Sequence, residues 1–122
     1  MPASTTLHEA ADALSAKTIE LHRAIVSLIE ELEAVDWYNQ RSEACKDAQL
    51  QSVLRHNRDE EIEHATMTLE WIRRNFAKFD ETLKLYLFTR GDITAIEAKE
   101  DGKQDAAELR LTVGEMKGRQ DG

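Results

Sequence analysis

The chain has 122 residues, which suffice for one domain but not for two ordinary ones. Charged residues make up 33% of the chain, aromatic residues only 6%, and there is one proline, so exposed helices are favoured over a sheet sandwich. The formal net charge of −8 argues against a nucleic-acid partner, because phosphates would repel the protein.

Neither a membrane nor an oxidising compartment is indicated by the sequence. No apolar run approaches membrane-spanning length, and the stretch from Met1 to Asp12 lacks the apolar centre of a signal peptide. Cys45 is the only cysteine, so no intramolecular disulfide can form. We therefore expect a cytoplasmic protein without a membrane partner, in which Cys45 is a small residue near a turn rather than a reactive or metal-binding thiol.

A first long helix is predicted from about Leu7 to about Tyr38. Its apolar positions recur in alternating steps of four and three, which is typical of one face of an α-helix. These positions are Leu14, Thr18, Leu21, Ile25, Leu28, Leu32 and Val35. Ile19, Val26 and Ile29 widen the apolar surface, so this helix should contact more than one partner.

A second helix with the same periodicity follows a polar connection from Gln40 to Asp47. Its apolar seam consists of Leu50, Leu54, Asn57, Glu61, His64, Thr68 and Trp71. A break is expected near Asn75. The two helices predict an antiparallel hairpin, which buries little core alone and should therefore oligomerise.

Shorter elements follow the hairpin. Residues 79–88 form a short apolar element, Gly91 marks a turn, and residues 93–98 suffice for one or two helical turns. The low hydrophobicity of residues 98–110 predicts a flexible linker. Residues 111–122 carry a brief apolar motif between polar flanks, which indicates a docking peptide on a tether. We thus divide the chain into a helical domain (1–97), a linker (98–110) and a tail (111–122).

Glu61 and His64 are the ionisable residues in the middle of the second seam. Three residues apart, they are neighbours on one helix face. Burying an unpaired carboxylate costs several kcal/mol, and a bound metal ion removes the problem. Carboxylate oxygen and imidazole nitrogen suit iron and leave positions open for dioxygen. The alternative is a chance Glu-x-x-His pair on a solvated helix, but its place on the seam favours a metal site.

Further metal ligands are available from the acidic cluster Glu30, Glu31 and Glu33. In an antiparallel hairpin that turns near residue 46, Glu31 should lie level with Glu61. A di-metal bundle needs such ligands from four helices, so one chain supplies half a site and two copies must meet. The Glu31 and Glu61 carboxylates of both copies would balance the charge of two ferrous ions per dimer.

Other polar and aromatic residues of the two helices have simpler interpretations. Tyr38 lies one turn beyond the acidic cluster and is a candidate ligand, hydrogen-bond partner or packing residue. Trp37 and Trp71 are interpreted as packing or interface residues. Surface positions are expected for His8, His22, His56, Asp59, Glu60 and Glu63.

Several stretches resemble the encapsulated ferritins, which are short ferritin-like chains housed inside encapsulin nanocompartments. These stretches are Glu30-Glu-Leu-Glu-Ala-Val-Asp-Trp-Tyr38, Asn57-Arg-Asp-Glu-Glu-Ile-Glu-His-Ala65 and Met67-Thr-Leu-Glu-Trp71, within a resemblance over about residues 8–97. The tail is similar to the encapsulin cargo-loading peptide, in which apolar residues flank a Thr-Val-Gly core. Here the core is Thr112-Val113-Gly114 and its flanks are Leu111 and Met116, the latter standing where that peptide often has Leu.

The resemblance implies an all-α fold in which a two-helix antiparallel hairpin with a short C-terminal helix completes a four-helix ferritin-like bundle by dimerisation. It also implies ferroxidase activity, the oxidation of Fe(II) by dioxygen at a di-iron site between two subunits. The implied iron ligands are Glu31, Glu61 and His64, with Tyr38 close to the metals. Glu30, Glu33 and Trp37 would form a secondary acidic site that guides iron inwards. A ring of ten subunits would feed iron storage inside the encapsulin shell.

Two rival functions remain at the level of sequence. The chain can be a non-catalytic helical cargo or adaptor protein of a compartment, with Glu61 and His64 as surface groups. It can also be an oxygen carrier or peroxidase on a related bundle. Hemerythrin-like carriers use more histidines, and rubrerythrin-like peroxidases usually add a cysteine-rich iron domain, which a single cysteine cannot form.

Overall fold

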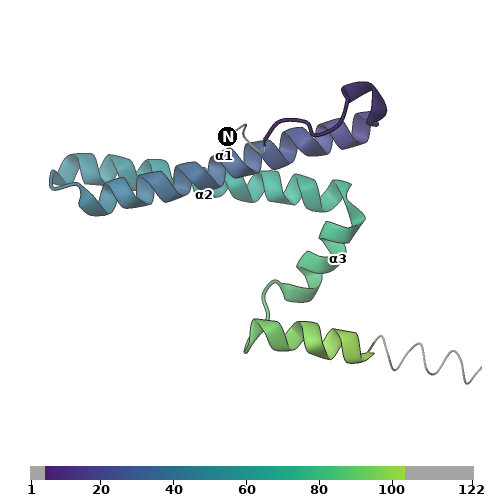
Figure 1. Cartoon of the computed structure of the whole chain (residues 1–122). Coiled ribbons are helices and arrows are strands. Elements are labelled where there is room, and N and C mark those ends of the chain that lie inside the picture. Colours follow the sequence, from purple (N-terminus) through teal and green to yellow (C-terminus); the bar gives the residue numbers. More distant parts are fainter. Residues whose placement is uncertain (1–4, 104–122) are drawn as a thin grey trace, which may run out of the picture. The chain divides into compact units, whose positions relative to one another are not determined.

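The computed structural model describes residues 5–103, which contain helices and no strand. A 3-10 turn, η1 (Ala11–Ala13), precedes α1 (Ala16–Ala44), α2 (Ala48–Asn75) and α3 (Ala77–Tyr86) (Figure 1). A further helix begins at residue 93 and continues to residue 103. The prediction of an all-α fold is therefore confirmed. The chain divides after Asp80 into two compact units, which are described separately below.

The ends of α1 differ from the prediction. Ser15 starts the helix, because its Oγ accepts a hydrogen bond from the Thr18 backbone N–H at 3.1 Å, and Leu14 is extended. The predicted start near Leu7 is therefore wrong. At the other end α1 continues beyond Tyr38 to Ala44, so the connection is reduced to residues 45–47. Asp47 then caps α2 by accepting from the Leu50 N–H at 2.8 Å.

The first unit is an antiparallel hairpin in which α1 and α2 run side by side (Figure 1). Side-chain hydrogen bonds tie the two helices together at three levels: Gln51 Nε2 to the Ser42 carbonyl (2.8 Å), Arg58 Nη1 to Asn39 Oδ1 (3.0 Å) and Thr68 Oγ1 to Glu31 Oε1 (3.1 Å). The predicted hairpin is therefore confirmed, and these three bonds show which polar groups meet across it.

Very little of the hairpin is buried within one chain. Among the described residues, Ala65 and Ile72 are the buried apolar side chains, whereas Leu32 and Met67 remain more than half exposed (54% and 58%). A pair of helices can bury only one side of each helix, so the second flank of α1 has no cover within the hairpin. Such a surface is typical of a helix pair that packs against further helices.

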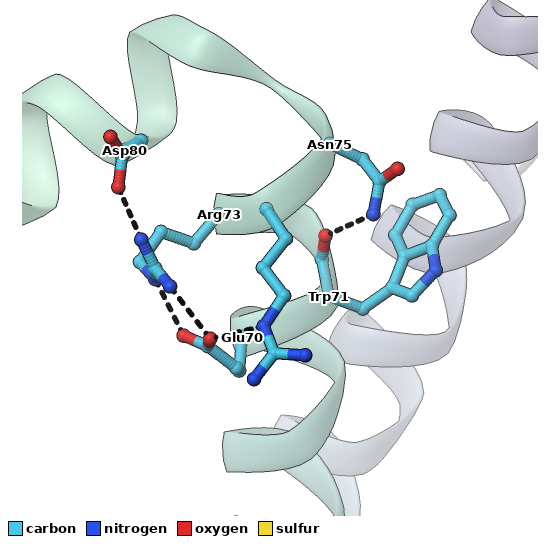
Figure 2. Close-up of polar contacts among 6 residues, drawn as sticks. Glu70, Trp71, Arg73, Asn75 and Asp80 are labelled. Atoms are coloured by element: carbon cyan, nitrogen blue, oxygen red, sulfur yellow. Dashed lines mark hydrogen bonds and ion pairs between the residues drawn. The ribbon is translucent and has the colours of Figure 1, made fainter.

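The break between α2 and α3 lies where the sequence predicts it, at Asn75 and Phe76. Figure 2 shows the Arg73 guanidinium between the carboxylates of Glu70 and Asp80. Its Nε and Nη2 donate to the two Glu70 oxygens at 2.6 and 2.8 Å, and Arg74 Nε also donates to Glu70 at 2.7 Å. These hydrogen bonds, from Arg73 first and then from Arg74, lower the pKa of Glu70 from 4.5 to about 2.

In the second unit, α3 ends at Tyr86, and Gly91 adopts the left-handed conformation with φ 85°. Asp92 then accepts hydrogen bonds from Thr94 N and Oγ1 at 2.9 and 2.7 Å, which start the helix at residues 93–103. This helix is longer than the one or two turns predicted, and residues 98–103 of the predicted linker are helical. The rest of the linker and the tail lie outside the described residues.

The helices of residues 5–103 do not include one that combines the length and apolar composition of a membrane span.

Candidate metal centre

Glu61 and His64 lie together on α2, as their spacing predicts. His64 Nδ1 is 3.7 Å from Glu61 Oε2, close enough for an ion pair but too far for a hydrogen bond. The Glu61 side chain is 27% exposed and that of His64 46%, so both can be reached from outside the chain. The pair therefore presents an oxygen and a nitrogen donor on one accessible face.

A second carboxylate lies on the other side of the His64 ring. Glu60 Oε2 is 4.0 Å from His64 Nε2, and Glu60 Oε1 is 3.7 Å from His56 Nε2. The two ring nitrogens of His64 thus face different carboxylates, Glu61 at Nδ1 and Glu60 at Nε2. His56 is largely exposed and Glu60 about half exposed (71% and 47%), in agreement with the surface positions expected for them.

Glu31 occupies a different environment from its acidic neighbours in the sequence. Its Oε1 accepts the hydrogen bond from Thr68 Oγ1 at 3.1 Å. Its Oε2 is buried and has no hydrogen-bond partner within the described part of the chain. Because a buried carboxylate oxygen without a hydrogen-bond partner is costly, Glu31 Oε2 is a candidate metal ligand.

The expected alignment of Glu31 with Glu61 stays a prediction, because the contact that the structure shows for Glu31 across the hairpin is with Thr68. Glu31 meets Thr68, which lies seven residues beyond Glu61, or about 10 Å along the helix axis. The physical reason is that side chains lean towards the N-terminus of their own helix. In an antiparallel hairpin the Glu31 carboxylate therefore leans towards later residues of α2, while Glu61 leans the opposite way.

The hairpin holds its candidate ligands in two groups. Within residues 5–103, no three His, Cys, Asp or Glu side chains of one chain gather closely enough to hold a metal ion. Glu61 and His64 form one group, and the free Glu31 oxygen forms the other. Oxygen and nitrogen donors of this kind suit Fe(II), so the residues fit iron by their chemistry.

The remaining candidate residues lie on α1. The Tyr38 ring packs under the Arg41 guanidinium, whose Cζ is 5.5 Å from the ring centroid. Trp37 is half exposed and lines a shallow depression with Gln40 and Arg41. Glu30 and Glu33 are exposed on the same helix. The structure therefore leaves these residues accessible, without assembling them into a metal site within one chain.

Thr68 is the residue that sequence reasoning placed on the seam without a role. Besides its contact with Glu31, its Oγ1 lies 3.1 Å from the His64 carbonyl oxygen, one turn earlier on α2. The available signal was a hydroxyl residue on an otherwise apolar stripe, four positions after His64. The partner on α1 could be found only from the packing of the two helices.

Comparisons with known proteins identify the family of the chain. Residues 6–90 match the family described as EncFtn-like. The chain is 61% identical over 95 residues to an encapsulated ferritin-like protein of Rhodospirillum rubrum; the aligned part is 78% of this chain and 68% of that protein. It is 50% identical over 95 residues to a ferritin-like protein of Thermotoga maritima, and here the aligned part is 78% of this chain and 83% of that protein.

A solved structure of similar fold supports the same assignment. It is the crystal structure of protein ne0167 from Nitrosomonas europaea, with a TM-score of 0.69 and 60% sequence identity. The match covers 71% of this chain and 96% of that one. The agreement of sequence and fold leads to one conclusion: the chain belongs to the EncFtn-like family of encapsulated ferritins.

Proposed function

We propose that this protein is a ferroxidase, which oxidises Fe(II) to Fe(III) with dioxygen at a site shared by two copies of the chain. The observation that carries the proposal is the buried, unpartnered Glu31 Oε2 in a hairpin that also presents Glu61 and His64. The part of the chain that the structure describes has donors for iron but gathers no cluster of three His, Cys, Asp or Glu side chains. Iron bound between two copies would satisfy the free oxygen and complete the site.

The charges of the site support iron in its ferrous form. Glu31 and Glu61 from each of two copies balance two Fe(II) ions, provided that His64 is neutral. On oxidation each Fe(II) gives one electron to dioxygen, and the carboxylates then favour the ferric product through its higher charge. His64 supplies a nitrogen donor, and the exposure of the pair in one chain leaves room for donors from a second copy.

Dimerisation is supported by the apolar surface of the hairpin. Exposed side chains on both helices, among them Leu32, Ile62 and Met67, need cover that the hairpin does not provide. Two hairpins packed face to face would form a four-helix bundle with the ligands in its centre. By resemblance to the family, we extend the proposal to a ring of ten subunits, with Tyr38 close to the iron and Glu30, Glu33 and Trp37 guiding iron inwards.

The proposed location is the interior of an encapsulin compartment in the cytoplasm. The relative from Rhodospirillum rubrum is named an encapsulated ferritin-like protein, and the tail of this chain has the Thr112-Val113-Gly114 core of a cargo-loading peptide. Co-expression of the full chain and a chain lacking residues 111–122 with an encapsulin tests this location. Only the full chain is expected to be loaded into the encapsulin shell. Equal loading of the full and the shortened chain would refute the role of the tail.

Native mass spectrometry before and after anaerobic addition of Fe(II) tests the shared site. We expect two iron ions per dimer and assembly into a larger ring. As a matched pair, Glu61→Gln should lose bound iron, whereas Glu63→Gln, on the exposed side of the same turn, should retain it. Chains that bind no iron would contradict the proposal and favour a non-catalytic cargo or adaptor protein.

A further inference from the structure

Thr68 links the two separate groups of candidate ligands. Its Oγ1 lies 3.1 Å from Glu31 Oε1 on α1 and 3.1 Å from the His64 carbonyl oxygen on α2. A threonine hydroxyl has one proton and therefore shares it between these two acceptors. No other hydroxyl within the described residues is hydrogen-bonded to Glu31. The side chain thus connects the Glu31 carboxylate with the helical turn that carries His64.

The two oxygens of Glu31 differ because only one of them accepts the hydrogen bond from Thr68. Oε1 is occupied by the Thr68 hydroxyl, whereas Oε2 is buried and unpartnered. A carboxylate held at one oxygen cannot rotate freely, and it presents its other oxygen in one orientation. In metal sites, hydrogen bonds of this kind orient the ligand, and their loss commonly reduces metal affinity or activity by about 10- to 100-fold.

The choice of threonine has a physical reason. In a helix the side chain of threonine is stiff at χ1, and its hydroxyl can bond to the carbonyl of the residue four positions earlier. The His64 carbonyl therefore holds the Thr68 hydroxyl in place while it also reaches Glu31. Valine has nearly the same shape without the hydroxyl, and serine has the hydroxyl without the methyl group, so the two replacements separate the roles of these groups.

We propose that Thr68 is a positioning residue that holds Glu31 Oε1 by a hydrogen bond, so that Glu31 Oε2 is presented to the metal ion. This inference rests on the proposed metal site, but it concerns a residue outside the ligand set. It assigns to Thr68 the orientation of one ligand rather than contact with iron. Its removal should leave both Glu31 oxygens without a partner in the hairpin.

The test is the binding of Co(II) to the full chain, measured by calorimetry and by the visible absorption of the bound ion. Thr68→Val should weaken the affinity by about 10- to 100-fold and alter the absorption spectrum. Thr68→Ser keeps the hydroxyl and should therefore lose much less affinity than Thr68→Val. Circular dichroism of each variant verifies that the helices are retained.

A double-mutant cycle provides a sharper measurement. If Thr68 acts through Glu31, then Thr68→Val should weaken Co(II) binding no further in a chain that already carries Glu31→Ala. Additional weakening in that background, unchanged binding by Thr68→Val, or equal weakening by Thr68→Val and Thr68→Ser would each overturn the positioning role. Absence of Co(II) and Fe(II) binding by the unmodified chain would instead remove the proposed function itself.

Discussion

Two carboxylates of the same hairpin, Glu70 and Glu31, differ in their hydrogen-bond partners. Glu70 accepts hydrogen bonds from Arg73 and Arg74 on its own helix, and its pKa is lowered to about 2. Glu31 has one hydroxyl partner, and its second oxygen is buried without any in the described structure. The first arrangement is complete within the chain. The hydrogen bonding of Glu31 is incomplete, as expected of a carboxylate that binds a ligand.

The comparison also explains why acidic residues alone do not identify a site. The chain has 24 acidic residues, so proximity in sequence to other acids distinguishes few of them. What separates Glu31 from Glu70 is the nature of the partner. Arginine satisfies a carboxylate permanently, because its charge is never lost, whereas a threonine hydroxyl satisfies one oxygen and leaves the negative charge uncompensated.

Removal of a proposed iron ligand should have the largest effect. Glu61→Ala or His64→Ala should slow the initial oxidation of Fe(II) by more than about 100-fold, the upper range for the loss of a mere outer partner. The helices should persist, because both side chains are partly exposed and neither fills the buried core. Stopped-flow absorbance of ferric product measures the rate, with Glu63→Ala as the exposed control on α2. Rates equal to that control would remove both residues from the site.

Neutralising Glu31 should change the free energy of unfolding of the chain, which tests whether its charge lacks a partner. In the metal-free chain, Glu31→Gln removes a partly buried charge but keeps an oxygen that can accept from Thr68, so the free energy of unfolding should rise by about 1 kcal/mol. Urea denaturation at one fixed protein concentration measures this change, since an oligomer's stability depends on concentration. The exposed control Glu33→Gln should change it by less than about 0.5 kcal/mol. A destabilised Glu31→Gln chain would show that the charge is already compensated.

The smallest effect is expected at the complete arrangement around Glu70. Because the pKa of Glu70 is lower in the folded chain, the unfolded chain binds more protons between pH 4.5 and about pH 2. The stabilisation is therefore fully present above pH 4.5 and is lost as the pH falls towards 2. At pH values above 4.5, Arg73→Gln should slightly lower the midpoint temperature of thermal unfolding. The midpoint should then fall less steeply as the pH is lowered from 4.5 towards 2. Arg55→Gln, at an exposed position on the same helix, is the control. A midpoint temperature with the same pH dependence in Arg73→Gln as in the unmodified chain would show that Arg73 does not lower the pKa of Glu70.

Local periodicity was sufficient for much of the fold. The hydrophobic spacing predicted the hairpin and its seam, and the spacing of three residues placed Glu61 beside His64. The break at Asn75 was also predicted. These features depend on residues within one or two turns of each other, where helix geometry leaves little freedom. The limits of α1 were missed because the capping side chain of Ser15 outweighs the apolar pattern that precedes it.

Contacts between helices required the tertiary structure. The meeting of Glu31 with Thr68 depends on the lean of side chains in opposite directions, which counting along the chain from a turn does not include. The pairing of Arg73 with Asp80 depends on how α3 leaves α2, and the unpartnered Glu31 Oε2 depends on every group that packs around it. The sequence by itself thus determined which residues are candidate metal ligands and which helix faces they occupy. Packing decided which of those residues are satisfied, because satisfaction depends on neighbours distant in the chain.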